Sequence, residues 1–473
     1  MLTAARLGAA ALTGALLTGA AAVPALADTA SPSPSAPAAT TTATTAAPAG
    51  VPAGLYGKGD ATYDGVWRQS LALLALHQEQ VVPADAAVDW LLGQQCADGG
   101  WPSYRADAAA ACTPATEDSN ATALAVQALA ALGGHQDQVA RGVAWFKANQ
   151  NPDGTWAYNP GTPGDANSTA LAVTSLLAAG TDPASVTASG HSALDGLAGF
   201  QLGCTAPGDQ RGAFAYQPVP GSPLTANTLA SAQALLAAAG GHLPVATTDR
   251  KAAAPKPLAC DAGQGAATVA PADSAEADSA YLTAKLAAGG QRLLLDTPGA
   301  AAGPDFNSTA WAVLGLVQAG HATEAASAAD WLAGNGYAWA AQGKNGTDPA
   351  AAATLVLTAR AAKLDPYNFG GANLVQLLVD SGPKPKSAPA AGDPQATRAP
   401  GSAITEPDEN SGFSAGWLIG VGLLVGIGAG LLLSLNRRRN AAAANAEATP
   451  AAETESATPA EDAPAEGEPE QNR

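Results

Sequence analysis

Residues 95–101 read QCADGGW and residues 150–156 read QNPDGTW, so one Q-x-x-x-G-x-W loop occurs twice in the chain. A third, degenerate copy runs from Gln201 through Gly212 to Phe214. Each Gln stands at the end of an amphipathic stretch, where its amide can pair with the free backbone groups of a helix end. The Gly permits a tight turn, and the aromatic ring can cover the junction between two helices. These loops therefore predict repeated helical hairpins.

An apolar helix is expected after each loop. Its start is marked by Asp, Asn or Thr, whose side chains accept hydrogen bonds from the free N–H groups of a first turn. Its end is marked by Gly, which adopts the left-handed conformation that closes a helix. Four clear copies start at residues 118–120, 165–167, 225–227 and 305–307 and end at 133–135, 180, 240–242 and 320–321, and two weaker copies cover 64–77 and 348–362. Because these six stretches are apolar nearly all round, we expect them to be buried.

Six further stretches between the apolar ones carry charges on one side only. They cover residues 84–95, 138–150, 192–201, 275–288, 323–334 and 371–380. One-sided charge is typical of helices that face water with their polar side. No alternating run is long enough to indicate a sheet. The sequence therefore predicts an all-α body over residues 56–382, in which six inner and six outer helices form a closed two-layer ring.

The N-terminal residues predict export. Residues 1–27 have a positive start at Arg6, an apolar stretch over 7–17 and a small-residue cleavage site at Ala25-Leu26-Ala27, which is the pattern of a signal peptide. Residues 28–55 are rich in Ser, Thr, Pro and Ala and predict a flexible, disordered leader. Export places the four cysteines in a compartment where disulfides form.

The C-terminal residues predict a membrane anchor. A Pro-rich stalk (383–414) precedes a span (415–435) of about twenty uncharged residues, enough to cross the hydrocarbon core as a single transmembrane helix. Arginines at 437–439 follow, so the body is expected outside the cell and the acidic, disordered tail (436–473) in the cytoplasm. Gly422, Gly426 and Gly430 are spaced for a homodimer through this helix, or are ordinary membrane composition. The net charge of −18 excludes a nucleic-acid partner.

The loops and helix starts also resemble known families. The Q-x-x-x-G-x-W loops resemble the QW repeat of the terpene cyclase, protein prenyltransferase and squalene-hopene cyclase superfamily, which implies the α6/α6 toroid fold. The helix start Asn167-Ser168-Thr169-Ala170 is similar to those of the cobalamin carriers of the intrinsic factor and transcobalamin group. That second resemblance makes a corrinoid a candidate ligand. Those carriers clamp it with an additional β-domain, and no such domain follows in this sequence.

The motifs of this superfamily's enzymes do not occur in the chain. The sequence has no DxDD acid, no DDxxD magnesium motif and no CGEQ thioester, and its cysteines are expected in disulfides rather than on zinc. We therefore expect a non-catalytic binding or interaction module at the cell surface, without catalytic residues or metal ligands. Its partner would be a small molecule, a surface glycan or a protein. The alternative is an enzyme of the terpene cyclase, prenyltransferase or glycan-acting toroid class.

The candidate binding residues lie where the inner helices start, because a closed ring brings all those starts to one mouth. They are Asp64, Asp118, Asn120, Asp165, Asn167, Asn227, Asp305 and Asn307, with Tyr104, Tyr158 and Tyr216 just beyond the loop aromatics. Two interpretations are open. The polar residues are helix caps and the tyrosines are packing, or the ring of amides, carboxylates and aromatic rings holds a ligand.

The four cysteines permit three disulfide pairings. The arrangement that fits the repeats joins Cys96 to Cys112 across the first loop and Cys204 to Cys260 across a long Pro- and Ala-rich insertion. Cys204 is expected on the face where the inner helices start, and Cys260 follows a helix that ends on the opposite face. An insertion of about thirty residues is long enough to connect the two faces when extended.

Overall fold

The computed structural model describes residues 51–246, 254–260, 268–295 and 302–388. Six of its helices form an inner set whose bounds follow the apolar stretches of the sequence. These helices are α1 (Gly65–Gln78), α3 (Ser119–Leu132), α5 (Ala166–Ala178), α7 (Thr228–Ala238), α9 (Phe306–Ala319) and α12 (Pro349–Ala361). Nearly every residue of α3 between Ala121 and Leu129 is buried, as expected for a helix that is apolar all round.

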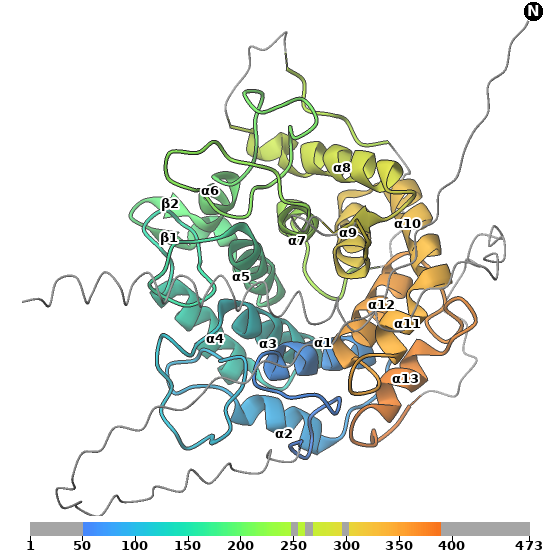
Figure 1. Ribbon diagram of the computed structural model, residues 1–473. Helices are drawn as coiled ribbons and strands as arrows, with labels where there is room; N and C mark the ends of the chain where they lie inside the picture. Colours follow the sequence, from blue (N-terminus) through green and yellow to red (C-terminus); the bar gives the residue numbers. More distant parts are fainter. Residues whose placement is uncertain (1–50, 247–253, 261–267, 296–301, 389–473) are drawn as a thin grey trace, which may run out of the picture. The chain divides into compact units, whose positions relative to one another are not determined.

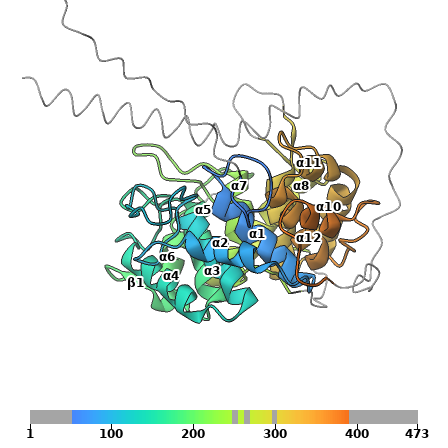
Figure 2. The same ribbon diagram turned by 90° about the horizontal axis from the view of Figure 1, so that it is seen from below.

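The inner helices contact one another in a closed series. α1 packs against α3, α3 against α5, α5 against α7 and α7 against α9; α9 then packs against α12, and α12 returns to α1. Figure 1 shows this order of helices, and Figure 2 shows α1 beside both α2 and α12. The first and last inner helices are therefore in contact, so the series of inner-helix contacts closes on itself.

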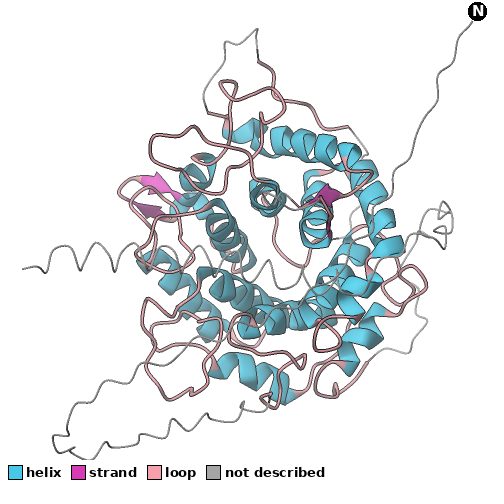
Figure 3. Cartoon of the chain, in the orientation of Figure 1, coloured by secondary structure: helices cyan, strands magenta, loops and turns pink. Residues whose placement is uncertain are grey.

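The outer helices lie outside the inner ones (Figure 1 and Figure 3). They are α2 (Asp85–Gly93), α4 (Gln136–Ala148), α6 (Ala193–Ala198), α8 (Pro271–Ala288), α10 (Ala322–Asn335) and α13 (Leu374–Asp380). α4 buries only Gly142, Val143, Trp145 and Phe146, so its charged side remains in solvent. The predicted division into buried and half-exposed helices is confirmed for the described residues.

Some elements differ from the sequence-based expectation. The predicted outer helices 192–201 and 371–380 are shorter in the structure. A short helix α11 (Tyr337–Ala341) and a 3₁₀ turn η1 (Pro183–Ser185) are added. Two tiny antiparallel hairpins also form, β1 (Thr187–Ala188) with β2 (His191–Ser192) and β3 (Leu293–Leu294) with β4 (Pro304–Asp305). Two-residue strands carry too little alternation to be recognised in a sequence.

The Q-x-x-x-G-x-W loops have the structural role that their residues predict. The Trp101 and Trp156 side chains are buried, and their Nε1 atoms donate to Leu91 O and Phe146 O, 2.9 Å in each case. The loop glycines adopt positive φ, 107° at Gly99 and 83° at Gly154. Each Trp thus fastens its loop to the end of the preceding outer helix.

Both disulfides of the favoured pairing are present, Cys96–Cys112 and Cys204–Cys260. Within the described residues no helix has the length and apolar character that a membrane crossing needs. The predicted signal peptide, transmembrane span and acidic tail lie outside the described residues, as do most of the leader and of the stalk.

Candidate ligand site at the helix starts

Most of the predicted acidic residues cap the inner helices. The Asp118 carboxylate accepts from Asn120 N at 2.8 Å and from Ala121 N at 3.0 Å. The same role is played by Asp165 toward Ser168 N, Asn227 toward Ala230 N, Asp305 toward Ser308 N and Asp348 toward Ala351 N, at 2.8–3.0 Å. Such bonds satisfy the free donors of a helix start. The capping interpretation therefore accounts for these side chains.

The capping carboxyls are shielded from water. Burial raises the pKa of Asp165 to about 6, although hydrogen bonds from Ser168 and Asn167 oppose the shift. Burial also raises the pKa values of Asp118, Asp305 and Asp348, again against the hydrogen bonds of their caps. Each of these carboxyl groups already accepts the backbone hydrogen bonds of its own helix start, so it is committed to capping rather than to a ligand.

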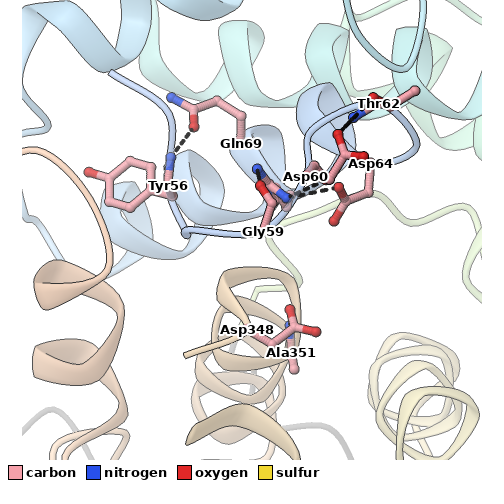
Figure 4. A network of polar contacts seen from close by, with 9 residues as sticks. Tyr56, Gly59, Asp60, Thr62, Asp64, Gln69, Asp348 and Ala351 are labelled. Atoms are coloured by element: carbon pink, nitrogen blue, oxygen red, sulfur yellow. Dashed lines mark hydrogen bonds and ion pairs between the residues drawn. The ribbon is translucent and has the colours of Figure 1, made fainter. Parts of the chain in front are cut away.

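Asp64 differs from the other helix-start carboxylates. It makes no side-chain cap bond and instead accepts from Arg68 Nη1 at 2.9 Å. Burial raises the pKa of Asp64 to about 6; the charge of Arg68 opposes this shift and that of Asp348 adds to it. Arg68 also donates to Asp60 O and Gly59 O, so it ties the loop before α1 to the helix. Figure 4 shows this loop above Asp348, where the first and last inner helices meet.

The predicted tyrosines fall into two different positions. Tyr158 O accepts from Ser119 N and Tyr216 O accepts from Ala166 N, so each closes the start of the preceding inner helix through its backbone. Ser103 O makes the equivalent bond to Val66 N. Tyr104 has no such bond among the described contacts, and its ring stacks on Trp90 with centroids 6.5 Å apart. Tyr104 is therefore not equivalent to Tyr158 and Tyr216, although all three follow a loop aromatic residue in the sequence.

The tyrosine side chains lie near the caps. Tyr158 Oη is 3.1 Å from Ser103 Oγ, which in turn donates to Asp118 at 2.7 Å. Burial raises the pKa of Tyr158, and the charge of Asp118 adds to this effect. Burial raises the pKa of Tyr216 to about 12. Both phenols are consequently neutral hydroxyl groups at ordinary pH.

The asparagines point away from the outer loops. The hydroxyl groups of Thr122 and Thr169 accept from the backbone N–H groups of Trp101 and Trp156, so this side of each helix faces its loop. Asn120 and Asn167 come two residues earlier, which places them about 200° round the helix. The amides therefore lie on the side that faces the interior of the closed helix series.

The same relation identifies three further residues. Thr309 Oγ1 accepts from Leu293 N, so Asn307 and Trp311, each two residues away, lie on the interior side of α9. On α1, Gln69 accepts from Tyr56 N in the preceding loop, so Trp67, two residues before Gln69, lies on the interior side as well. We call this set the axial face, and it consists of Trp67, Asn120, Asn167, Asn307 and Trp311.

Contacts between separate helices support the axial face. The indole rings of Trp67 and Trp311 lie 6.5 Å apart, although α12 stands between their helices in the series. Asn167 Nδ2 donates to Gln233 Oε1 on α7. Trp67, Trp311 and Gln233 were not among the residues predicted from the sequence. The position of Trp67 could have been predicted from the sequence spacing. Trp67 comes two residues before Gln69, which binds a loop, just as Asn120 comes two residues before Thr122.

The other end of the helix series is covered by the chain itself. After α7, Leu243 N donates to Gln127 Oε1 on α3 at 2.9 Å, and Gln127 Nε2 donates to Thr174 on α5 at 3.2 Å. Leu243 and Val245 are buried. This segment passes α5 to reach α3, so it packs across the interior beneath the axial face. Access to that face is therefore from the side of the helix starts.

Two other features do not belong to this site. A groove of 520 Å³, lined by Leu129, His135, Val139 and Lys147 among others, lies at the end of α3 and so on the opposite side from Asn120. The Cys96 and Cys112 sulfurs lie near the Glu117 carboxylate, but the disulfide leaves no thiolate to bind a metal. Glu117 accepts from Trp145 Nε1 at 3.0 Å, and burial raises its pKa to about 7.

The histidines after the closing glycines are spread through the fold. His135 and His321 stand at the starts of α4 and α10. His321 Nε2 lies 3.2 Å from Glu276, and His242 Nδ1 lies 3.1 Å from the neighbouring Leu243 O. They thus occupy three separate surroundings rather than one metal-binding cluster.

Comparisons with known proteins agree with the loop motifs. The family model of the squalene-hopene cyclase C-terminal domain matches residues 46–166. A squalene-hopene cyclase from Schizosaccharomyces japonicus is 28% identical over an alignment of 123 residues that covers 22% of this chain and 18% of that enzyme. This chain thus spans less than a fifth of the length of that relative. The predicted resemblance to the cyclase and prenyltransferase superfamily is confirmed, and the resemblance to cobalamin carriers stays a prediction.

A solved structure is also similar in part. A protein from Actinoplanes aligns with a TM-score of 0.38 and 18% identity, over 66% of this chain and 79% of that one.

Proposed function

We propose that the chain is an exported, membrane-anchored α6/α6 toroid that binds a small ligand on its axial face without transforming it. The closed series of inner-helix contacts supports the toroid, because such a series brings six helix starts together. The signal-peptide and membrane-span patterns support display outside the cell, with the acidic tail in the cytoplasm.

The observation that favours binding over catalysis is the use of the carboxylates. Asp118, Asp165, Asp305 and Asp348 accept backbone hydrogen bonds from their own helices and are shielded from water. The side chains of the axial face are amides and indoles, which neither donate a proton nor form a covalent bond with a ligand. A surface of this kind can recognise a molecule but supplies no acid or nucleophile.

The second candidate is a terpene-cyclase-like enzyme. The match of residues 46–166 to the squalene-hopene cyclase domain favours it, and so does Asp64, whose pKa of about 6 would suit an acid. Arg68 weakens this candidate, because its guanidinium holds the Asp64 carboxylate in an ion pair and so favours the charged form.

A turnover assay separates the two candidates. The full chain is inserted into lipid vesicles and incubated with squalene, and the extracted lipids are analysed for cyclised products. We expect squalene to be recovered unchanged. A cyclic product that forms with the wild type and disappears with Asp64→Asn would overturn the binding proposal and establish the enzyme.

A further inference from the structure

The axial face contains buried polar atoms that the protein does not satisfy. Among the described residues, Asn120 Oδ1, Asn167 Oδ1 and Trp311 Nε1 are buried and have no hydrogen-bond partner. Asn167 is 7% exposed and Trp311 is 1% exposed. Native proteins rarely leave such groups unpaired, since each costs free energy in the folded state. These atoms, from three different helices, therefore favour a polar partner supplied from outside the chain.

The chemistry of these atoms restricts that partner. An amide oxygen needs a donor and an indole N–H needs an acceptor, so the partner must offer both. A bare isoprenoid hydrocarbon offers neither and would leave all three atoms unpaired.

Charge disfavours anionic partners. The five axial residues are uncharged, and the capping carboxylates of Asp118, Asp165 and Asp305 come two residues before Asn120, Asn167 and Asn307. Arg68 is held by Asp64 and by two backbone carbonyl groups. A diphosphate or a sialylated sugar would therefore approach the carboxylates that cap these helices, which disfavours its binding.

The aromatic residues supply a flat apolar surface. Trp67 is only partly buried, and its ring lies 6.5 Å from that of Trp311. Indole faces bury large apolar areas, and the Trp311 N–H is a donor without a partner among the described residues. A pyranose ring suits this arrangement, since its C–H face is apolar and its edge carries hydroxyl groups that both donate and accept.

We propose that the axial face binds a neutral saccharide, with the sugar ring against Trp67 and its hydroxyl groups paired with Asn120, Asn167 and Trp311. This inference rests on the proposed function and adds the ligand class. Since the interior is covered on the other side by Leu243 and Val245, the sugar enters from the helix starts. A chain end, rather than the middle of a long glycan, fits a site with a single entrance.

Binding is tested with the full chain in lipid nanodiscs and a panel of neutral oligosaccharides built from glucose, mannose, galactose or N-acetylglucosamine. Their sialylated and phosphorylated counterparts and squalene serve as comparisons. Tryptophan fluorescence and calorimetry report binding. We expect one neutral sugar to bind, and its anionic counterpart to bind at least about 10-fold more weakly, given the surrounding carboxylates.

Variants locate the bound sugar. Asn120→Leu, Asn167→Leu and Trp67→Leu should each weaken sugar binding about 10- to 100-fold, because each removes a hydrogen bond or the stacking surface. The matched control is Tyr337→Ala, which removes an aromatic ring that is 47% exposed on α11 and should leave binding unchanged. Circular dichroism confirms that each variant is folded. If the more buried Asn167→Leu is unstable, Asn120→Leu alone tests the amide contacts.

The outcomes separate two kinds of failure. If squalene or an anionic sugar binds and the axial variants abolish that binding, the neutral-saccharide class is wrong while the binding site stands. If a neutral sugar binds equally to the wild type and to all three axial variants, both the site and the saccharide inference are wrong. If nothing in the panel binds to folded protein, the saccharide inference is wrong.

Discussion

The junction between the first and last inner helices contains a buried ion pair whose removal is informative. Glu79, just after α1, accepts from Arg360 Nε on α12 at 2.8 Å and from Arg360 Nη2 as well. Their side chains are 1% and 9% exposed. Burial disfavours the charge of Arg360, but the Glu79 carboxylate holds the pKa of the guanidinium above its ordinary value. We choose Glu79→Gln, which keeps the shape of the side chain and removes its charge.

The expected loss follows from the burial of the pair. Removing one partner of a buried ion pair leaves an uncompensated charge and costs about 3–5 kcal/mol. That range corresponds to a decrease of roughly 100- to 4,000-fold in the equilibrium constant for folding. An exposed pair is screened by water and contributes only about 0–1 kcal/mol. Lys285 and Asp209 form such a pair, 3.9 Å apart and with both side chains exposed, so Asp209→Asn is the matched control.

The assay is urea denaturation of the full chain in detergent with both disulfides intact, followed by tryptophan fluorescence. We expect Glu79→Gln to lower the free energy of unfolding by at least about 3 kcal/mol and Asp209→Asn by less than about 1 kcal/mol. The double variant Glu79→Leu with Arg360→Met should recover most of the loss, because it leaves no unpaired charge. Equal, small losses in Glu79→Gln and Asp209→Asn would refute the reasoning about this junction.

Three other predictions concern stability. Asp118→Ala should lower the free energy of unfolding by about 0.5–2 kcal/mol through loss of the α3 cap, and an unchanged denaturation midpoint would contradict the capping role. Burial raises the pKa of Asp278 well above its ordinary value, although Ser231 opposes the shift. The contribution of Asp278 to stability is therefore complete below about pH 4 and is lost as the pH rises through the raised pKa. Asp278→Asn should accordingly raise the free energy of unfolding at pH 7 and leave it unchanged at pH 4. An equal change in the free energy of unfolding at both pH values would argue against this linkage. The double variant Cys204→Ser with Cys260→Ser opens a loop with a sequence separation of 56 and should lower the free energy of unfolding by about 4 kcal/mol. A melting temperature equal to that of the wild type would count against a structural role of this disulfide.

The helical repeat could be predicted from the sequence because its signals are local. Capping Asp and Asn residues, closing glycines and one-sided charge each act within one turn of a helix, so their spacing indicates where helices start and end. The positive φ values at Gly180 and Gly320 agree with this expectation. Short elements such as α11 and the two hairpins depend on packing between distant segments and leave no comparable local pattern.

The candidate site was predicted only in part. The asparagines were identified, but so were carboxylates such as Asp165, because a capping residue and a ligand-binding residue look the same at a helix start. What separates Asp165 from Asn167 is direction: the first accepts from its own helix, and the second reaches Gln233 on the next inner helix. Trp67 and Trp311 meet only in the folded protein, across about 240 residues of chain.

The most direct test of the account compares two substitutions in the first turn of one helix. The dissociation constant of the neutral oligosaccharide selected from the panel is measured by calorimetry for Asp165→Ala and for Asn167→Leu, beside the wild type. We expect sugar binding to weaken about 10-fold or more in Asn167→Leu and the dissociation constant to be unchanged in Asp165→Ala once folding is confirmed. Loss of binding in Asp165→Ala with wild-type binding in Asn167→Leu would contradict this expectation.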